Sequence, residues 1–507
     1  MKERVMHKPL VTCLLILMLL PVSARAAQIL EQFENRVSTF TLDNGLTLLV
    51  IERHRAPVAS FVTFVDVGGV NEPQGHSGIA HFSEHMAFKG TTSIGTTDWR
   101  AEKALLSKVD AAYRKWLQAK YRSGIDRDRL EELRKTFEDL KEQAKEFVVP
   151  NAFAKIIERN GGTDLNAGTS KDYTMYFCSL PANRAELWFS LESDRLMNPV
   201  FREFFTEKEV VLEERRQRVD SDPIGRMVEE LLSMAYAAHP YGTPTIGWQS
   251  DIVATTRQDM RAFYEAHYVP ENITIAVAGD VDPEQIRKLA ETYFGPMADL
   301  DPQLELITKE PQQGGERSFI QKGPNQPVFM EAYHSVDQLH KDAKPLELLA
   351  DILARGRISR LYNSLVDRQG LAQTVQAFNG FPGDKYPGLF LIYAVPHQDV
   401  SLSKLIDALH QELRDIRENG VTQEELDRAK TRIRADLIRS LKSNLGLARK
   451  LAKAEAQTGD WRWVFSSLDE FAQVDVQDIK RVARKYLRPA NRTAGRMIYQ
   501  DGPEGDQ

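Results

Sequence analysis

The sequence has only two cysteines among its 507 residues. Cys13 lies in an apolar segment near the N-terminus, which leaves Cys178 as the one cysteine in the rest of the chain. Because a disulfide needs two thiols, the chain without that segment cannot form an internal disulfide, even in an oxidising compartment. We therefore expect packing alone to stabilise the fold, and we interpret Cys178 as a buried apolar residue.

The sequence also lacks an excess of basic residues. It has 66 lysines and arginines against 72 acidic residues, which gives a formal net charge of −6. A mildly acidic balance argues against nucleic acid as a partner. No glycine-rich phosphate loop stands out, because Gly356 and its neighbouring arginines lack the strand–loop–helix context. With 42% apolar and 27% charged residues the chain is a folded globular protein, and its length favours two or more domains.

Long apolar runs are absent beyond the N-terminus. There, three basic residues precede an apolar run from Leu10 to Val22, and Ala24-Arg25-Ala26 offers small residues at a cleavage site. This pattern predicts a secretory signal peptide over residues 1–26 and hence export, with the periplasm as the expected location. A retained membrane anchor is the alternative, but the run is shorter than the about 20 residues of a spanning helix. After cleavage no membrane span is expected.

Two segments near the ends of the two halves repeat each other. Residues 258–272 and 477–491 align without a gap, and Gln, Asp, Pro and Asn coincide. Each copy predicts an amphipathic helix, a proline-containing turn and then a strand. Both halves also open with strands and continue into long helices, so the sequence predicts an α+β fold of two homologous domains, each a mainly antiparallel sheet packed with helices. The predicted strands are Ser38–Glu52, Val58–Val67 and Ile273–Ala278, then Arg317–Gln321, Val328–His334 and Thr493–Tyr499.

Polar segments without a sheet pattern suggest the boundaries. Residues 310–316, with the sequence EPQQGGE, predict a linker between a first domain over residues 27–309 and a second over residues 317–507. Charged residues dominate at about residues 98–150, where Ser123-Gly124 separates two helical patterns. We predict an inserted helical hairpin there. It either packs on itself or on the domain, or forms an arm that docks a partner or guards the substrate.

The segment most informative about function is His81-Phe82-Ser83-Glu84-His85. Residues four apart on a helix lie on one face, so His81 and His85 can share one metal ion, with Glu84 beside both. We expect the helix to start around Ser77-Gly78, after glycines that allow a close approach to a neighbouring strand. The alternative is a pair of core histidines that only satisfy hydrogen bonds.

A catalytic zinc site needs a third protein ligand and an open position for water. The best source is the segment from Thr206 to Asp220, which predicts a helix with Glu207 and Glu214 two turns apart on one face. One carboxylate can bind the metal while another supports the ligands. A solvated charged face is the alternative, and spacing alone does not choose among Glu207, Glu209, Glu213 and Glu214.

These residues resemble the pitrilysin/insulinase family of inverzincins, whose signature is HxxEH, and especially its shorter branch, which includes the mitochondrial processing peptidase and bacterial homologues. The resemblance implies one zinc ion per chain, held by His81, His85 and Glu214, with Glu207 supporting the ligands and Glu84 as the general base. The segments that carry it are GIAHFSEHMAFKGT, GGTDLNAGTSKDYTMY, LESDRLMNPVF, EKEVVLEERR, HPYGTPTIGW, VAGDVDPEQI and GRISRLYNSLVDRQGLA.

The resemblance further implies a zinc endopeptidase that hydrolyses peptides or unfolded polypeptide segments, and the predicted signal peptide adds export. Zinc lowers the pKa of its water, and Glu84 accepts the proton as the water attacks the peptide carbonyl. The segment from Asp164 to Ser170 looks like the family's edge strand, to which an extended substrate adds through main-chain bonds. The expected substrate contacts are Asn166, Ala167 and Thr169.

One departure from the family pattern lies in the second half. Active assemblies of the family have an arginine and, seven residues later, a tyrosine that reach over the zinc site, whereas here Val366 and Gln373 hold those places. Arg368 is offset by two positions and would face another way on a helix. We therefore expect a heterodimer with a sister subunit that supplies the Arg/Tyr pair, the second domain of this chain having no metal site. The alternative function is a non-catalytic peptide-binding or scaffold subunit.

Overall fold

The computed structural model describes residues 34–300, 306–324 and 326–499. The predicted signal peptide, residues 1–26, lies outside the described residues. Within these ranges, no helix combines the length and the apolarity needed to cross a bilayer.

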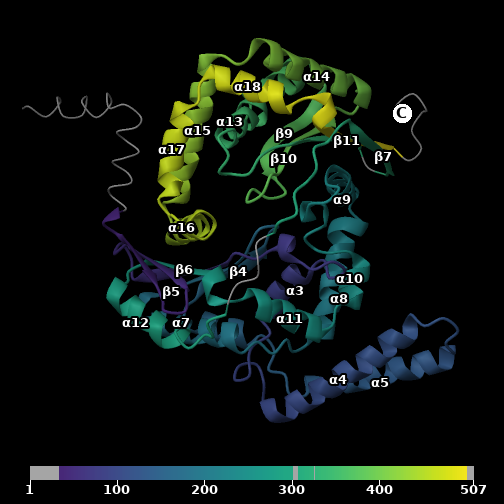
Figure 1. Ribbon diagram of the computed structural model, residues 1–507, viewed down its shortest axis with the longest axis vertical. Helices are drawn as coiled ribbons and strands as arrows, with labels where there is room; N and C mark the ends of the chain where they lie inside the picture. The colour runs from purple at the N-terminus through teal and green to yellow at the C-terminus, as the bar shows by residue number, and fades with distance from the viewer. Residues whose placement is uncertain (1–33, 301–305, 325, 500–507) are drawn as a thin grey trace, which may run out of the picture.

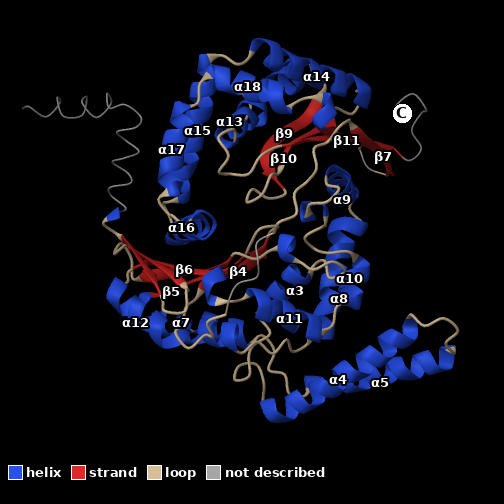
Figure 2. Ribbon diagram, viewed as in Figure 1, coloured by secondary structure: helices blue, strands red, loops and turns tan. Residues whose placement is uncertain are grey.

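The first half is built on a six-stranded sheet in the order β1-β2-β6-β3-β5-β4 (Figures 1 and 2). Neighbouring strands are antiparallel except for β2 and β6, which run parallel. The predicted single strand Ser38–Glu52 is wrong in one respect, because a turn around Gly45 divides it into β1 and β2. The strands are β1 (Val37–Thr41), β2 (Thr47–Glu52), β3 (Val58–Val65), β4 (Thr163–Thr169), β5 (Thr174–Pro181) and β6 (Ile273–Gly279).

The first half contains ten α-helices in the part of the chain that the structure describes. Figure 2 shows α7 and α12 beneath one face of the sheet, and α3, α8 and α11 beyond the end near β4. The helices are α3 (Ile79–Met86), α4 (Trp99–Lys120), α5 (Arg127–Lys145), α6 (Ala152–Arg159), α7 (Ala185–Met197), α8 (Phe204–Arg215), α9 (Pro223–Ala235), α10 (Gln249–Ala254), α11 (Arg257–His267) and α12 (Pro283–Phe294).

The second half repeats the arrangement on a five-stranded sheet in the order β7-β11-β8-β10-β9, in which only β7 and β11 are parallel. Its strands are β7 (Arg317–Gly323), β8 (Val328–His334), β9 (Ala372–Phe381), β10 (Leu389–Pro396) and β11 (Arg492–Tyr499). Its helices are α13 (Ala343–Ala354), α14 (Leu402–Asn419), α15 (Gln423–Ser440), α16 (Asn444–Thr458), α17 (Trp463–Gln473) and α18 (Val476–Tyr486). The predicted fold class, α+β with mainly antiparallel sheets, is confirmed.

The sequence repeat corresponds to one structural unit in each half. In both copies a helix, α11 or α18, leads through a 3₁₀ turn into a strand at an interior position of its sheet, β6 or β11. Each helix begins with a capping box, between Thr256 and Asp259 in the first copy and between Asp475 and Asp478 in the second. The matching aspartates of the repeat therefore satisfy the same orphan amides at the helix start.

In each half, one face of the sheet is covered by a helix from the other half. Side chains alternate along the strands, so Leu48 and Val50 of β2 join the core under α7 and α12, whereas Leu49 and Ile51 point to the opposite face. That face packs against α16 of the second half. Conversely, α9 of the first half packs against β7, β8 and β11 of the second sheet. The two halves thus share their hydrophobic cores.

The predicted linker contacts both halves. No helix or strand occurs from Leu306 to Glu316. The Glu310 carboxylate accepts hydrogen bonds from the backbone N–H groups of residues 237–239, and the Gln313 side chain donates one to the carbonyl of Arg492. The domain boundary at residues 310–316 stays a prediction.

The inserted hairpin consists of α4 and α5 and projects away from both sheets (Figure 1). Its base is fixed by a buried ion pair between Glu102 of α4 and Arg202, with a separation of 2.8 Å. The Tyr113 hydroxyl donates to the carbonyl of Val253 at 2.6 Å and accepts from the ammonium of Lys208 at 3.0 Å. The two helices of the hairpin therefore pack on each other, and its base packs on the first half.

We expect Tyr113→Phe to lower the free energy of unfolding by about 1–2 kcal/mol, because it removes a buried hydrogen bond and leaves the Val253 carbonyl without this donor. Urea-induced unfolding monitored by circular dichroism measures the change. Tyr121→Phe is the matched control, since the Tyr121 side chain is 65% exposed at the tip of the hairpin. Equal stability of both variants and the parent protein would contradict the anchoring role.

Candidate metal centre

The helix with the HxxEH segment starts at a tightly packed glycine. Gly78 has φ +85°, and a Cβ atom there would lie 2.4 Å from the Ile246 carbonyl oxygen, so only glycine fits. The Glu72 carboxylate accepts hydrogen bonds from the N–H groups of Gly78 and Ala80, at 2.9 and 3.0 Å. Burial raises the pKa of Glu72 to about 8, although the charge of Lys171 opposes this shift. Glu72 therefore caps α3 and fixes its start.

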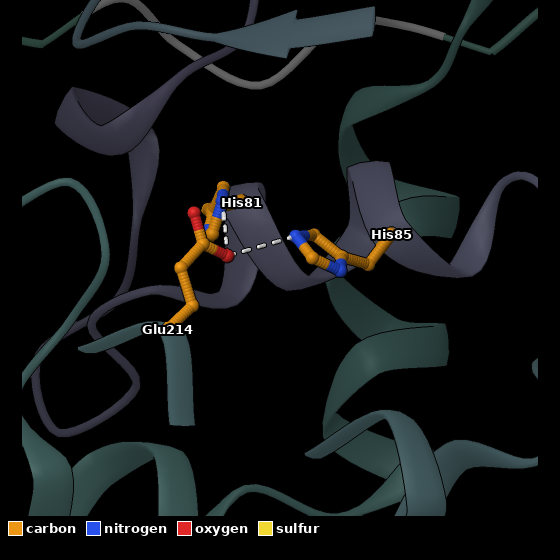
Figure 3. Close-up of side chains that lie close together, drawn as sticks. All are labelled: His81, His85 and Glu214. Carbon is orange, nitrogen blue, oxygen red and sulfur yellow. Dashed lines mark ion pairs between the residues drawn. The ribbon is translucent and has the colours of Figure 1, made fainter. Parts of the chain in front are cut away.

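Three candidate ligands come together from two helices. His81 and His85 extend from α3, and Glu214 extends from α8 toward both rings (Figure 3). Glu214 Oε2 lies 3.7 Å from His81 Nε2 and 3.3 Å from His85 Nε2. One ligand atom from each residue lies within 4.8 Å of the other two.

This geometry fits a zinc ion. Zinc–nitrogen and zinc–oxygen bonds are about 2.0–2.2 Å long, so the donor atoms around a tetrahedral ion lie about 3.4 Å apart. The separations of 3.3 and 3.7 Å are close to that value. The side chains are partly exposed, by 12% for His81, 21% for His85 and 18% for Glu214, so solvent reaches the site. The donor set and its access to water therefore suit a catalytic rather than a closed structural site.

Further charged groups hold the candidate ligands in place. His85 Nδ1 lies 2.8 Å from Glu207 Oε1, and the other Glu207 oxygen is 2.6 Å from the Lys89 ammonium. The second Glu214 oxygen, Oε1, pairs with Arg218 at 2.8 Å. Since one ring nitrogen of His85 is occupied by Glu207, the other is directed at Glu214. This is the usual carboxylate–histidine arrangement beside a metal.

The two imidazoles differ in their electrostatic surroundings. Burial, with the neighbouring charge of His85, lowers the pKa of His81 to about 4. Burial also acts to lower the pKa of His85, but its bonds to Glu207 and Glu214 outweigh this and raise that pKa to about 9. The carboxylates of Glu207 and Glu214 thus favour a positive charge between them. His81 is neutral near pH 7, the form in which histidine binds metals.

Glu84 connects the centre to the edge of the first sheet. The hydroxyl of Thr169, the last residue of β4, donates a hydrogen bond to Glu84 Oε2 at 2.6 Å. Burial raises the pKa of Glu84, and the bond from Thr169 opposes this. Among the strands that the structure describes, β4 lies at the edge of its sheet and pairs only with β5. Asn166 and Ala167, the other predicted substrate contacts, lie on the same edge strand.

On the peptidase activity that the family resemblance implies, we expect Thr169→Val to lower kcat by about tenfold, because a hydrogen bond to a charged group contributes about 1.5–3 kcal/mol and here keeps Glu84 in position. Zinc content should not change. Initial rates and metal analysis of the same preparation measure both quantities. Thr163→Val, at the far end of β4, is the matched control, and an equal loss in both variants would indicate general damage to the strand.

The structure separates the four candidate glutamates. Glu214 and Glu207 face the histidines, as described above. Glu209 instead pairs with Lys141 of the hairpin at 3.1 Å, and Glu213 pairs with Arg216 at 2.7 Å. The predicted helix Thr206–Asp220 is helical throughout. Its α-helical part, α8, ends at Arg215, and a π-helical turn from Arg216 to Asp220 follows.

Three residues near the centre were missed from the sequence: Glu72, Lys89 and Arg218. Arg218 follows Glu214 by four residues, a spacing that on a helix places both side chains on one face and could have indicated it. Lys89 follows His85 by four residues but lies beyond the end of α3 at Met86, so helix spacing does not indicate it. No sequence signal distinguishes Glu72, because its bonds depend on how the chain folds back before α3. Val366 and Gln373 lie in the second half, in a π-helical segment (Tyr362–Arg368) and in β9.

Comparisons with known proteins identify the family. Residues 48–139 and 141–248 match the family described as insulinase (peptidase family M16), and residues 254–433 match the peptidase M16 inactive domain. The chain is 28% identical over 487 residues to the zinc protease PqqE of Helicobacter pylori, covering 94% of this chain and 95% of that protein.

Two further similarities extend over nearly the whole chain. A probable mitochondrial-processing peptidase subunit beta from Schizosaccharomyces pombe is 26% identical, with 89% of each chain covered. The crystal structure of a protease from Helicobacter pylori superposes with a TM-score of 0.75 and 26% identity, covering 91% of this chain and 99% of that one. This chain therefore belongs to the insulinase (M16) family of peptidases.

Proposed function

We propose that this chain is the zinc-bearing subunit of an exported endopeptidase that acts in the periplasm on peptides or unfolded polypeptide segments. The observation that carries the proposal is the convergence of His81, His85 and Glu214, with separations near 3.4 Å, beside a half-buried carboxylate, Glu84. The resemblance to zinc proteases supports the choice of metal. The N-terminal sequence pattern supports export.

Each residue of the centre has a distinct role in this proposal. His81 Nε2, His85 Nε2 and one oxygen of Glu214 hold the zinc ion, and Glu207 orients His85 through its other ring nitrogen. When bound, zinc polarises the attacking water and the peptide carbonyl. Glu84 accepts the proton from that water and then passes it to the leaving amine. Thr169 keeps the Glu84 carboxylate in reach of both.

The free edge of β4 is the proposed substrate site. An extended peptide pairs with Asn166 and Ala167 through main-chain hydrogen bonds, which depend little on the peptide sequence. Thr169 belongs to the same strand and bonds to Glu84. A peptide bond held on this strand therefore comes to lie beside the catalytic carboxylate.

The missing Arg/Tyr pair leads to the second part of the proposal, a sister subunit of the same family. Val366 and Gln373 provide neither a charge nor a phenol at the places where the family has them. We expect the purified chain to be a poor peptidase alone and to reach full rate with the sister subunit, isolated by co-purification with the tagged chain from its own cells. If the chain alone has full activity and adding the sister subunit does not change it, the proposal of a sister subunit is wrong.

A non-catalytic peptide-binding or scaffold subunit is the competing function, and the residues Val366 and Gln373 favour it. Zinc analysis together with a peptide-library digest of the assembled protein distinguishes the two. The peptidase proposal expects about one zinc per chain, cleavage that stops with a chelator, and recovery when zinc is restored. Peptide binding without zinc and without cleavage, in the presence of the sister subunit, would support the scaffold.

A further inference from the structure

A loop of the second half contacts the first half beside the end of β4, the strand proposed to bind the substrate. The loop consists of residues 382–388, between β9 and β10, and Figure 1 shows it directed toward the first half. The backbone N–H groups of Asp384 and Lys385 donate hydrogen bonds to one carboxylate oxygen of Asp172, at 2.9 and 3.2 Å. Asp172 lies in the turn that joins β4 to β5, three residues after Thr169.

Asp172 also joins this loop to a buried tyrosine of the first half. Its other carboxylate oxygen accepts a hydrogen bond from the Tyr241 hydroxyl, which in turn accepts one from the N–H of Tyr386 in the same loop. Both Asp172 and Tyr241 are buried. Bonds to an ionised acceptor are stronger than those between neutral groups. The loop, the turn and Tyr241 therefore form one connected unit, which we call the loop–turn junction.

The loop approaches the turn so closely that residue 383 has to be glycine. A Cβ atom added to Gly383 would lie 2.5 Å from Asp172 Oδ2 and 2.5 Å from the Tyr241 hydroxyl oxygen. Both side chains are buried and hydrogen-bonded, so neither can move aside without breaking a bond. Gly383 does not have a positive φ angle, so its backbone conformation alone would accept another residue. The close contact is what requires glycine there.

The turn that the loop holds leads directly to the catalytic carboxylate. The Ser170 N–H donates to the carbonyl of Tyr173 at 2.8 Å, and the Ser170 hydroxyl accepts from the N–H of Asp172 at 3.1 Å. These bonds close a tight turn. Thr169 immediately precedes it, and the Thr169 hydroxyl donates to Glu84 at 2.6 Å. A displacement of the turn would therefore reach Thr169 before the rest of β4.

The loop–turn junction is not needed to hold the two halves together. The apolar contacts of α9 and α16, each with the sheet of the other half, already do so. Hydrogen bonds add direction, because they weaken steeply when the donor and the acceptor are misaligned. The polar junction therefore fixes where the turn lies relative to the loop.

We propose that Asp172 is a positioning residue, through which the second half of this chain holds Thr169, and with it the Glu84 carboxylate, in place for catalysis. This inference rests on the peptidase function proposed above. It gives the second half, which the sequence predicts to have no metal site, a part in catalysis within the same chain. Asn166 and Ala167 lie further from the turn and pair with β5, so loosening the junction should lower kcat more than it raises KM.

The first test is hydrogen–deuterium exchange of the full chain, read by mass spectrometry, which needs no activity. Gly383→Ala should speed exchange of the amides in residues 163–174 by at least about tenfold, because the added methyl group separates the loop from Asp172. Gly314→Ala is the matched control, since a Cβ atom there has no listed neighbour within 4 Å, and it should change nothing. Unchanged exchange of residues 163–174 in the Gly383→Ala protein would overturn the proposal.

The second test is the kinetics of peptide hydrolysis by the chain with its sister subunit. Asp172→Ala and Gly383→Ala should each lower kcat by about tenfold, the loss expected for Thr169→Val, and change KM by less than about threefold. Asp172→Asn should recover most of this loss. Its amide oxygen can still accept from the loop N–H groups, and its NH₂ group can donate to the Tyr241 oxygen. A loss in Asp172→Asn as large as in Asp172→Ala would contradict the positioning role.

The double variant Gly383→Ala/Thr169→Val separates positioning from general damage. If the junction acts through Thr169, the double variant loses no more than either single variant, about tenfold, whereas independent effects would multiply to about 100-fold. A multiplied loss, or a rise in KM as large as the fall in kcat, would overturn the proposal. If the parent assembly does not cleave peptides, the proposed function fails, and the exchange experiment still decides whether the junction holds the end of β4.

Discussion

Replacing Glu84 with glutamine is expected to reduce kcat/KM for peptide hydrolysis by about 10²–10⁴-fold, the range contributed by a general base. Glutamine has the same shape and can still accept the hydrogen bond from Thr169, but its amide cannot take up a proton. Glu84 is not among the three groups that converge on the candidate metal position, so zinc content should stay near one per chain. Initial rates on a peptide substrate and metal analysis of the same sample measure both quantities.

The control for this variant is Glu213→Gln, on the same side of the protein. Glu213 is exposed and pairs with Arg216, away from the histidines, so its replacement should leave rate and metal content unchanged. A zinc-loaded Glu84→Gln protein with the parent rate would exclude Glu84 as the base. Loss of zinc together with activity would instead mean that Glu84 helps to bind the metal.

The parts of the site that the sequence could predict are those set by local geometry. His81 and His85 are four residues apart, and a helix places such residues on one face whatever surrounds it. The start of that helix at Gly78 was also predicted, because a glycine is compatible with the left-handed backbone observed there. The same holds for α11 and α18, whose capping residues lie within each helix start.

The choice of the third ligand depended on a long-range contact. Glu207 and Glu214 lie two turns apart on one face, and only the position of α8 relative to α3 determines which carboxylate reaches both imidazoles. The family resemblance selected Glu214, whose carboxylate lies 3.7 Å from His81 Nε2 and 3.3 Å from His85 Nε2. The role of Glu214 as a ligand stays a prediction. The bond from Thr169 to Glu84 was not predicted, since Thr169 was assigned only to substrate binding. Strand β4 and helix α3 are far apart in the sequence, so no local pattern connects them.

The sequence also did not predict that each half packs a helix on the sheet of the other half. An apolar stripe on α9 or α16 shows that the helix is half-buried but not against which sheet. The two helices occupy the same place in the repeat. Two further helices separate α9 from β6 and α16 from β11. Each nevertheless packs on the sheet of the other half. A boundary at residues 310–316, as predicted, would therefore divide the chain but not its hydrophobic cores.

The second large effect is expected for the third ligand. Glu214→Ala should lower zinc affinity by more than about 100-fold, because removing the support of a ligand already costs about 10–100-fold and a ligand itself contributes more. Alanine is favourable in a helix, and Glu214 lies near the end of α8, so the fold should persist. Competition with a chromophoric chelator measures the affinity.

A series of three variants on α8 tests whether the assignment of roles is correct. Glu207→Ala should lower zinc affinity by about 10–100-fold, since Glu207 acts through His85 Nδ1, and Glu213→Ala should not change it. Because Glu207 is already bonded to His85 and Lys89, it has less freedom than Glu214 to turn toward a metal. The reverse order, with the greater loss for Glu207→Ala, would make Glu207 the ligand and require α8 to shift along α3. Equal losses for all three would indicate that the charge of the helix, rather than one carboxylate, attracts the ion.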